Sequence, residues 1–180
     1  MKNLGLSFFL ATALLLLPAF SFANELPKKA AKEATVLQKQ ETAAIQREPV
    51  YEPNENDIKS FVYRWFSWLD HQVSDFLLLY HLSKDDLVMK LPEALVRNHS
   101  DFKKWYQGMK DTIQSNNYEV GDIKVTGLPK GRYKVDLSLR WKAKTYKGES
   151  LDMKFKQSWI LSLAGSGRLN INRYVVKKTK

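Results

Sequence analysis

Residues 133–145 alternate between apolar and polar side chains without interruption. A period of two over this length predicts a long β-strand with one dry face and one solvent-facing face. Residues 151–163 repeat the pattern. Two such strands in one hairpin twist and curl, so other elements must cover the concave dry face. On the first strand that face comprises Tyr133, Val135, Leu137, Leu139, Trp141 and Ala143.

The other segments predict an α+β fold. Apolar residues spaced three and four apart predict helices between Ile58 and Tyr80, with a break near Asp70, and a further helix capped by Ser100 or Asp101 and ended by Asn116-Asn117. A short strand is expected at 87–91. Short glycine-containing links predict antiparallel neighbours among the later strands. We therefore expect three N-terminal helices packed on a strongly curved antiparallel sheet, a cone-like α+β barrel. The four later strands are expected at 118–128, 132–146, 151–163 and 168–176.

The N-terminal part has the pattern of a secretory signal peptide over residues 1–23, with small residues before a cleavage site at Asn24. The alternative is an uncleaved segment that anchors the protein to the inner membrane. Residues 24–53 are expected to form a flexible linker or a frayed helix, and the folded domain should cover 54–180, with Asn54 as the first helix cap. Because the chain has no cysteine, an exported domain depends on its core alone, which fits the periplasm best.

The positive charge is concentrated near the C-terminus. The chain has a net charge of +10, and residues 118–180 hold 15 Lys and Arg against 5 Asp and Glu. Such a surface favours an anionic protein or envelope partner, and the alternative is ordinary solubility charge. Nucleic acid is not expected, since the chain is exported and the basic face lacks interleaved exposed aromatic residues. The predicted basic face consists of Lys134, Arg140, Lys142, Lys144, Lys154 and Lys156.

Two segments are similar to those of a known superfamily. Residues 80–92 read YHLSKDDLVMKLP and residues 100–106 read SDFKKWY. They resemble the helix-to-strand passage and the third helix of the nuclear transport factor 2-like superfamily, which includes SnoaL-like polyketide cyclases, ketosteroid isomerases and scytalone dehydratases. The resemblance covers roughly residues 54–177 and implies a pocket between the concave sheet face and the helices. It also implies a homodimer through the sheet as one arrangement.

The resemblance implies no isomerase chemistry. The ketosteroid isomerases place a carboxylate just before the proline that ends the first strand, where this chain has Leu91. Their helix-one tyrosine aligns with Trp65, and their second acid aligns near Phe155. All three expected polar positions are apolar here, so we expect a superfamily member without the usual catalytic residues.

The candidate pocket residues combine aromatic rings with two polar groups. Five aromatic residues, Trp105 among them, are expected to line or fill the cone. A polar group on a concave apolar face must find a partner, which is either a neighbour or a ligand. The predicted pocket residues are Trp65, Tyr106, Trp141, Gln157, Trp159 and Arg173.

Catalytic alternatives are few. Asp70 and His71 form the sharpest acid–base pair, although adjacent helix residues point about 100° apart. His81 is expected to be a half-buried structural histidine, and His99 lies in a loop. The three histidines lack metal-ligand spacing, so no metal is expected, and no motif indicates a cofactor.

Two hypotheses follow from the sequence. The first is an exported, non-catalytic binding or scaffold protein with an aromatic pocket for a small apolar ligand and a basic sheet face. The second is a small lyase, isomerase or cyclase that uses Asp70 or His71 in the cone pocket, with Gln157 or Arg173 as the polar stabiliser.

Overall fold

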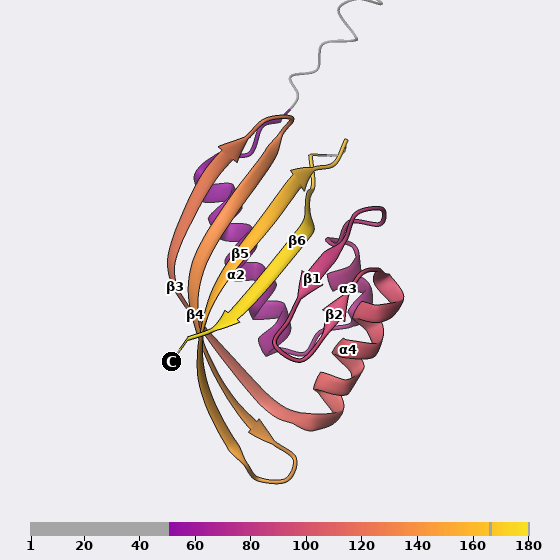
Figure 1. Ribbon diagram of the computed structural model, residues 1–180, viewed down its shortest axis with the longest axis vertical. Helices are drawn as coiled ribbons and strands as arrows, with labels where there is room; N and C mark the ends of the chain where they lie inside the picture. The colour runs from indigo at the N-terminus through magenta and orange to yellow at the C-terminus, as the bar shows by residue number, and fades with distance from the viewer. Residues whose placement is uncertain (1–50, 166, 180) are drawn as a thin grey trace, which may run out of the picture. The chain divides into compact units, whose positions relative to one another are not determined.

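The computed structural model describes residues 51–165 and 167–179 (Figure 1). The predicted signal peptide and most of the predicted linker lie outside these residues. Among the residues described, no helix is both long enough and apolar enough to span a membrane. The elements, in chain order, are α2 (Glu55–Asp70), α3 (Asp75–Leu79), β1 (Val88–Lys90), β2 (Leu95–Val96), α4 (His99–Thr112), β3 (Ile113–Leu128), β4 (Arg132–Thr145), β5 (Ser150–Leu163) and β6 (Leu169–Lys178).

Helix α2 begins at a capping box. The Asn54 side chain accepts hydrogen bonds from the backbone N–H groups of Asn56 and Asp57, and the Asp57 carboxylate accepts one from the Asn54 N–H in return. These bonds satisfy N–H groups that have no partner within the helix. The start of the folded part at Asn54 therefore has a local cause.

Two helix boundaries differ from the prediction. Helix α4 is capped by Asn98, whose side chain accepts from the Asp101 N–H. It ends at Thr112, not at Asn116-Asn117, because β3 already pairs with β4 at Ile113. Pairing across the sheet takes these residues out of the helix and lengthens the strand at its N-terminal end.

The sheet has six strands in the order β2-β1-β6-β5-β4-β3. Strands β3 to β6 are antiparallel neighbours, as predicted. The expectation of a wholly antiparallel sheet is wrong, since β1 pairs with β6 in parallel. The chain reaches β1 before it forms the long strands, so β1 adds to the edge of β6 and not to a strand adjacent in sequence. β2 was not predicted, because two residues carry no readable periodicity.

The core lies between α2 and the inner face of the sheet, and α2 runs behind the strands in Figure 1. Trp65 of α2 meets Trp159 of β5 edge to face at a centroid distance of 6.4 Å, and Tyr174 of β6 stacks on Trp159 at 4.8 Å. On β4, Val135 and Leu139 are buried, and Lys134 points away from them. The structure therefore confirms the prediction, made from the alternation, of which face of β4 is buried.

Candidate functional site

An aromatic cavity of about 230 Å³ opens where the inner face of the sheet extends past the end of α2. At roughly 30 Å³ per water molecule this is space for about eight waters, or for a ligand the size of one substituted aromatic ring. The helices contribute Leu69, Trp105 and Met109, and the β1–β2 turn contributes Leu91, Pro92 and Glu93. The long strands contribute Tyr118, Leu139, Trp141, Met153, Phe155, Gln157, Tyr174, Val176 and Lys178.

Two phenols line this aromatic cavity. Burial raises the pKa of Tyr118 well above its usual value, and the neighbouring Tyr174 hydroxyl and Asp70 carboxylate raise it further. Burial also raises the pKa of Tyr174, while Gln157 and Trp65 act in the opposite direction. Both phenols therefore stay protonated at neutral pH and can donate hydrogen bonds.

Gln157 is the one buried amide on the wall. Its side chain is 6% exposed, and its Oε1 accepts a hydrogen bond from Trp159 Nε1 at 3.0 Å. This bond holds the amide against the core. Gln157 thus satisfies a neighbour, one of the two roles that the sequence allowed, and it also lines the aromatic cavity.

One acidic and one basic side chain, Glu93 and Lys178, are among the residues that line the aromatic cavity. Glu93 is exposed in the β1–β2 turn, and its Oε1 accepts from Trp105 Nε1 at 2.9 Å. Lys178 lines the aromatic cavity from the end of β6. Sequence reasoning missed both residues. A turn after Pro92 could have indicated that Glu93 lies near the pocket, because the backbone reverses there to pair β1 with β2.

The predicted pocket residues divide into two groups. Trp141 and Gln157 line the aromatic cavity. Trp65 and Trp159 do not, and both are almost fully buried in the core. Tyr106 is also buried, and its hydroxyl donates to the Val73 carbonyl at 2.7 Å. Burial raises the pKa of Tyr106 to about 12, so this donor is retained at neutral pH.

Arg173 does not point into the pocket, contrary to the expected register. Ile160 pairs with Arg173 and Leu161 pairs with Ile171, which leaves Asn172 as an extra residue in β6. A bulge of one residue reverses the alternation after it. Arg173 is consequently exposed, and Tyr174 takes the inward position.

Asp70 and His71, the predicted acid–base pair, each form a hydrogen bond with a backbone group and not with each other. The Asp70 carboxylate accepts from the Tyr118 N–H at 2.9 Å, and burial raises the pKa of Asp70. His71 is exposed, and its Nδ1 donates to the Ser67 carbonyl at 2.7 Å. Neither side chain lines the aromatic cavity, so the structure does not bring them together as a dyad.

The remaining histidines contact backbone carbonyls. His81 Nδ1 lies 3.0 Å from the Leu169 oxygen, and His99 Nε2 lies 3.2 Å from the Leu82 oxygen. In the described part of the chain, no three His, Asp or Glu side chains gather in a way that could hold a metal ion.

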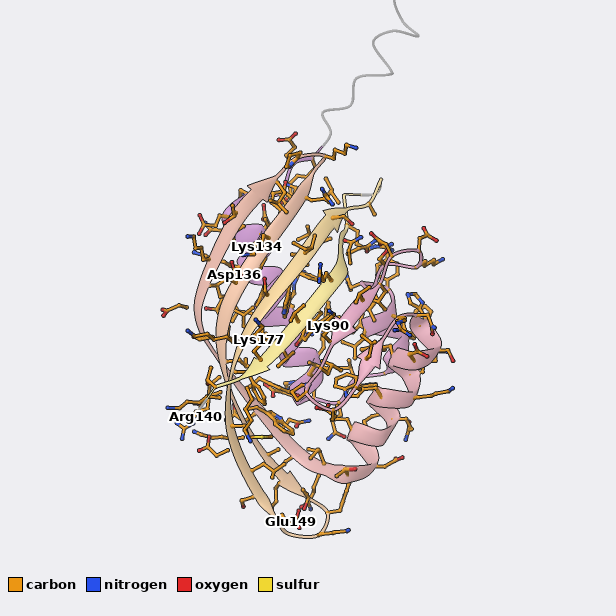
Figure 2. All side chains as sticks on the ribbon, in the orientation of Figure 1. Lys90, Lys134, Asp136, Arg140, Glu149 and Lys177 are labelled. Carbon is orange, nitrogen blue, oxygen red and sulfur yellow. The ribbon has the colours of Figure 1, made fainter. Side chains whose placement is uncertain are left out.

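The outer face of the sheet is basic, but several of its cations are paired. Lys134 contacts Asp136 at 2.8 Å, Arg140 forms a two-point contact with Asp152, and Lys142 contacts Glu119. Figure 2 shows Lys134 and Asp136 on β4 and Lys177 on β6. Within residues 51–165 and 167–179, Lys144, Lys154 and Lys156 form no ion pair.

A lysine hollow of about 500 Å³ lies on this outer face. We use this name for the depression flanked by Lys124, Lys156 and Lys177. Lys156 and Lys177 are directly opposite each other on β5 and β6. Like charges opposite each other in a sheet are destabilising. Asp122 and Asp136 also line the hollow, so among the described residues it holds three lysines against two carboxylates.

Solved structures show the same architecture. A nuclear transport factor 2-like superfamily protein from Salmonella enterica aligns with 69% of this chain and 90% of its own, at a TM-score of 0.63 and 12% identity. Nuclear transport factor 2 from Cryptosporidium parvum aligns with 67% and 90%, at 0.55 and 13%. This chain has the nuclear transport factor 2-like fold. The superfamily resemblance of residues 54–177 is thereby confirmed at the level of the fold.

The nuclear transport factor 2-like fold does not by itself name an activity. The beta subunit of benzoate 1,2-dioxygenase from Burkholderia mallei also shares it, with a TM-score of 0.59, 15% identity, and coverage of 70% of this chain and 91% of that one. The similar structures thus include a subunit of an enzyme and a transport factor. No protein-family model matches the sequence, and no curated protein does. Function must be argued from the site.

Proposed function

We propose that this protein is an exported, non-catalytic binding protein whose aromatic cavity holds a small apolar ligand with one hydrogen-bond acceptor. The observation that carries the proposal is the cavity of about 230 Å³, which has aromatic walls and protonated phenols at Tyr118 and Tyr174. Apolar walls with a few placed polar groups are typical of small-molecule sites. The phenol hydroxyls favour a ligand carbonyl or ether oxygen.

The same geometry favours binding over catalysis by the predicted pair. Asp70 and His71 are engaged with the backbone and lie outside the aromatic cavity. An enzyme of the lyase, isomerase or cyclase type would instead need Glu93, the carboxylate at the rim. Glu93 is exposed and already accepts from Trp105, so it lacks the apolar enclosure that makes a carboxylate an effective base at neutral pH.

Methyl-selective NMR of the methionines tests the ligand site. Met109 and Met153 line the aromatic cavity, whereas Met89 is buried outside it. We expect acetophenone to shift the Met109 and Met153 methyl signals in a saturable manner, with a Kd on the order of 1 mM or tighter. The Met89 signal should stay in place. Ethylbenzene, which lacks the acceptor, should bind about tenfold more weakly.

A cavity-filling variant provides the control. Val176→Phe places a ring in the aromatic cavity and should abolish the acetophenone shifts. Val125→Phe changes another half-buried valine that does not line the cavity, and it should retain them. Equal binding by both variants, or shifts that include Met89, would refute the ligand site.

The lysine hollow supports a second role, contact with an anionic partner. Lys156 and Lys177 face each other across two strands, and no acid among the described residues pairs with either. An acidic polypeptide laid across the outer face would offset this repulsion. The same repulsion opposes a homodimer that brings two copies of this face together, so we favour the acidic partner.

A further inference from the structure

A second cleft, separate from the aromatic cavity, lies at the opposite end of α2. It has a volume of about 450 Å³ and is enclosed by the start of α2, by His81 two residues after α3, and by the turn between β5 and β6. None of its lining residues lines the aromatic cavity. Its polar side chains include Asp57, Ser60, Arg64, His81 and Arg168. We call it the arginine cleft.

Arg168 is held in place from two sides. Its guanidinium carbon lies 3.9 Å from the centre of the Tyr80 ring, and its Nε donates to Asn170 Oδ1 at 3.0 Å. A guanidinium has five N–H donors, so the terminal nitrogens remain for another acceptor. Within residues 51–165 and 167–179, neither Arg64 nor Arg168 forms an ion pair.

His81 adds a third nitrogen donor or acceptor to the arginine cleft. Its ring stacks on Trp68 at 5.1 Å and contacts Phe61 at 5.3 Å. Because Nδ1 lies against the Leu169 carbonyl, Nδ1 carries the hydrogen and Nε2 is the nitrogen left over. Burial lowers the pKa of His81, and the charges on Arg168 and Arg64 lower it further. His81 is therefore neutral at neutral pH, with two arginines near its ring.

Asp57 is the one carboxylate among the described residues that line the arginine cleft. Its carboxylate accepts from the Asn54 N–H in the capping box at 2.9 Å. The Tyr51 side chain and this backbone bond together hold the pKa of Asp57 below its usual value. The carboxylate is thus ionised and held at the start of α2, and the cleft has two arginines against this one acid.

We propose that the arginine cleft binds a phosphate group, with Arg64 and Arg168 as the charged donors and Ser60 as a hydroxyl donor. Guanidinium groups match phosphate oxygens with paired hydrogen bonds. A bound phosphate would place negative charge beside Arg64 and Arg168, neither of which forms an ion pair within residues 51–165 and 167–179. The phosphate belongs either to a small soluble molecule or to a lipid headgroup.

Histidine NMR on the full chain tests the proposal with inorganic phosphate as the probe. We expect saturable movement of the His81 ring signal and an upward shift of its pKa, because a bound anion favours the imidazolium. His71 and His99 lie outside the arginine cleft, and their signals should stay in place. Absence of movement at His81 up to 50 mM phosphate would overturn the proposal.

Arginine variants assign the donors. Arg64→Gln and Arg168→Gln should each weaken phosphate binding at least tenfold, and Arg168→Lys should recover only part of the loss, because lysine lacks the paired geometry. Arg97→Gln removes an exposed arginine outside the cleft and should leave binding unchanged. Should Arg168→Gln unfold the protein, Arg64→Gln alone decides, since Arg64 is exposed. Binding that all variants retain equally would overturn the assignment.

Two further binding measurements distinguish a soluble phosphate ester from a lipid headgroup. Glycerol phosphate represents soluble monoesters, and vesicles of phosphatidylglycerol represent lipid headgroups, with phosphatidylcholine vesicles as the uncharged control. Loss of binding in Arg64→Gln with glycerol phosphate alone supports a soluble ligand, and loss with phosphatidylglycerol vesicles supports a lipid. If Arg64→Gln changes neither, the cleft does not recognise phosphate.

Discussion

His81 illustrates how the surroundings of one residue set its chemistry. Its imidazole is half-buried among Phe61, Trp68 and Tyr80. This burial lowers its pKa below the ordinary value of 6.5, and the charges of Arg168 and Arg64 lower it further. The sequence shows only a histidine after an apolar stripe. The arginine next to it in space comes from a turn far along the chain, so its influence is visible only in the fold.

The lowered pKa of His81 makes stability depend on pH. Above pH 6.5 the histidine is neutral in both states and has no effect. As the pH falls below 6.5 the unfolded chain takes up the proton first, so the free energy of unfolding decreases until the lower folded pKa is reached. We expect a loss of at most about 1.4 kcal/mol per pH unit in this window.

Urea unfolding between pH 7.5 and pH 5, in buffers without phosphate, measures this effect. His81→Phe keeps a ring against Trp68 and should show a shallower dependence than the unchanged protein. Asp70 does not obscure the result. Burial raises its pKa from 3.8, so its titration makes the free energy of unfolding increase as the pH falls, which is opposite in sign to the effect of His81. A stability that is constant over this range, or a slope that His81→Phe retains, would contradict the assignment.

At the scale of elements, short-range bonds decide where the helices start. Asn54 satisfies two N–H groups at the start of α2, and Asn98 satisfies one, that of Asp101, at the start of α4. Such caps depend on residues within three positions. The sequence indicated Asn54 correctly, but it indicated Ser100 or Asp101 where Asn98 caps α4. Helix ends are different here, since α4 stops where its residues join the sheet.

Removal of the α2 cap should have a measurable cost. Asn54→Ala leaves the Asn56 and Asp57 N–H groups without their side-chain acceptor and should lower the free energy of unfolding by about 1 kcal/mol. Asn56→Ala removes an exposed asparagine whose side chain does not cap the helix, and its effect should stay within about 0.5 kcal/mol. Denaturant titration compares the two. Equal effects would mean that the cap contributes little.

At the scale of the molecule, charge and apolar surface are divided between the two faces of one sheet. The inner face carries the core and the aromatic cavity, while the outer face carries the lysine hollow. The arginine cleft lies away from both, beside the start of α2. A single fold thus has an apolar cavity and two depressions with basic side chains, and the three can be tested separately.

The lysine hollow predicts salt-dependent binding of acidic polypeptides. Polyglutamate should bind the full chain more weakly as the salt concentration rises. A triple change of Lys124, Lys156 and Lys177 to Gln should weaken binding about tenfold, at up to about 0.5 kcal/mol per exposed contact.

The matched control removes the same charge elsewhere. A triple change of Lys84, Lys104 and Lys147 to Gln affects exposed lysines outside the hollow and should leave polyglutamate affinity within twofold. Binding measured by fluorescence anisotropy at two salt concentrations separates the outcomes. Salt-independent binding, or an equal loss in both triple variants, would exclude the hollow as the contact surface.

The sequence alone determined the features that depend on near neighbours. Alternation over 133–145 predicted which face of β4 is dry, and Asn54 marked the start of α2. The resemblance carried by 80–92 led to the correct fold. The dry face and the helix start could be predicted because side-chain direction along a strand and capping at a helix start are local properties.

Only the tertiary structure decided which residues meet in the sites. The extra residue Asn172 turns Arg173 outward and Tyr174 inward, and one such residue is invisible in an alternating pattern. The turn after Pro92 brings Glu93 to Trp105, and the β5–β6 turn brings Arg168 to His81. Each contact joins segments distant in sequence, so its formation depends on sheet register and packing rather than on any local pattern.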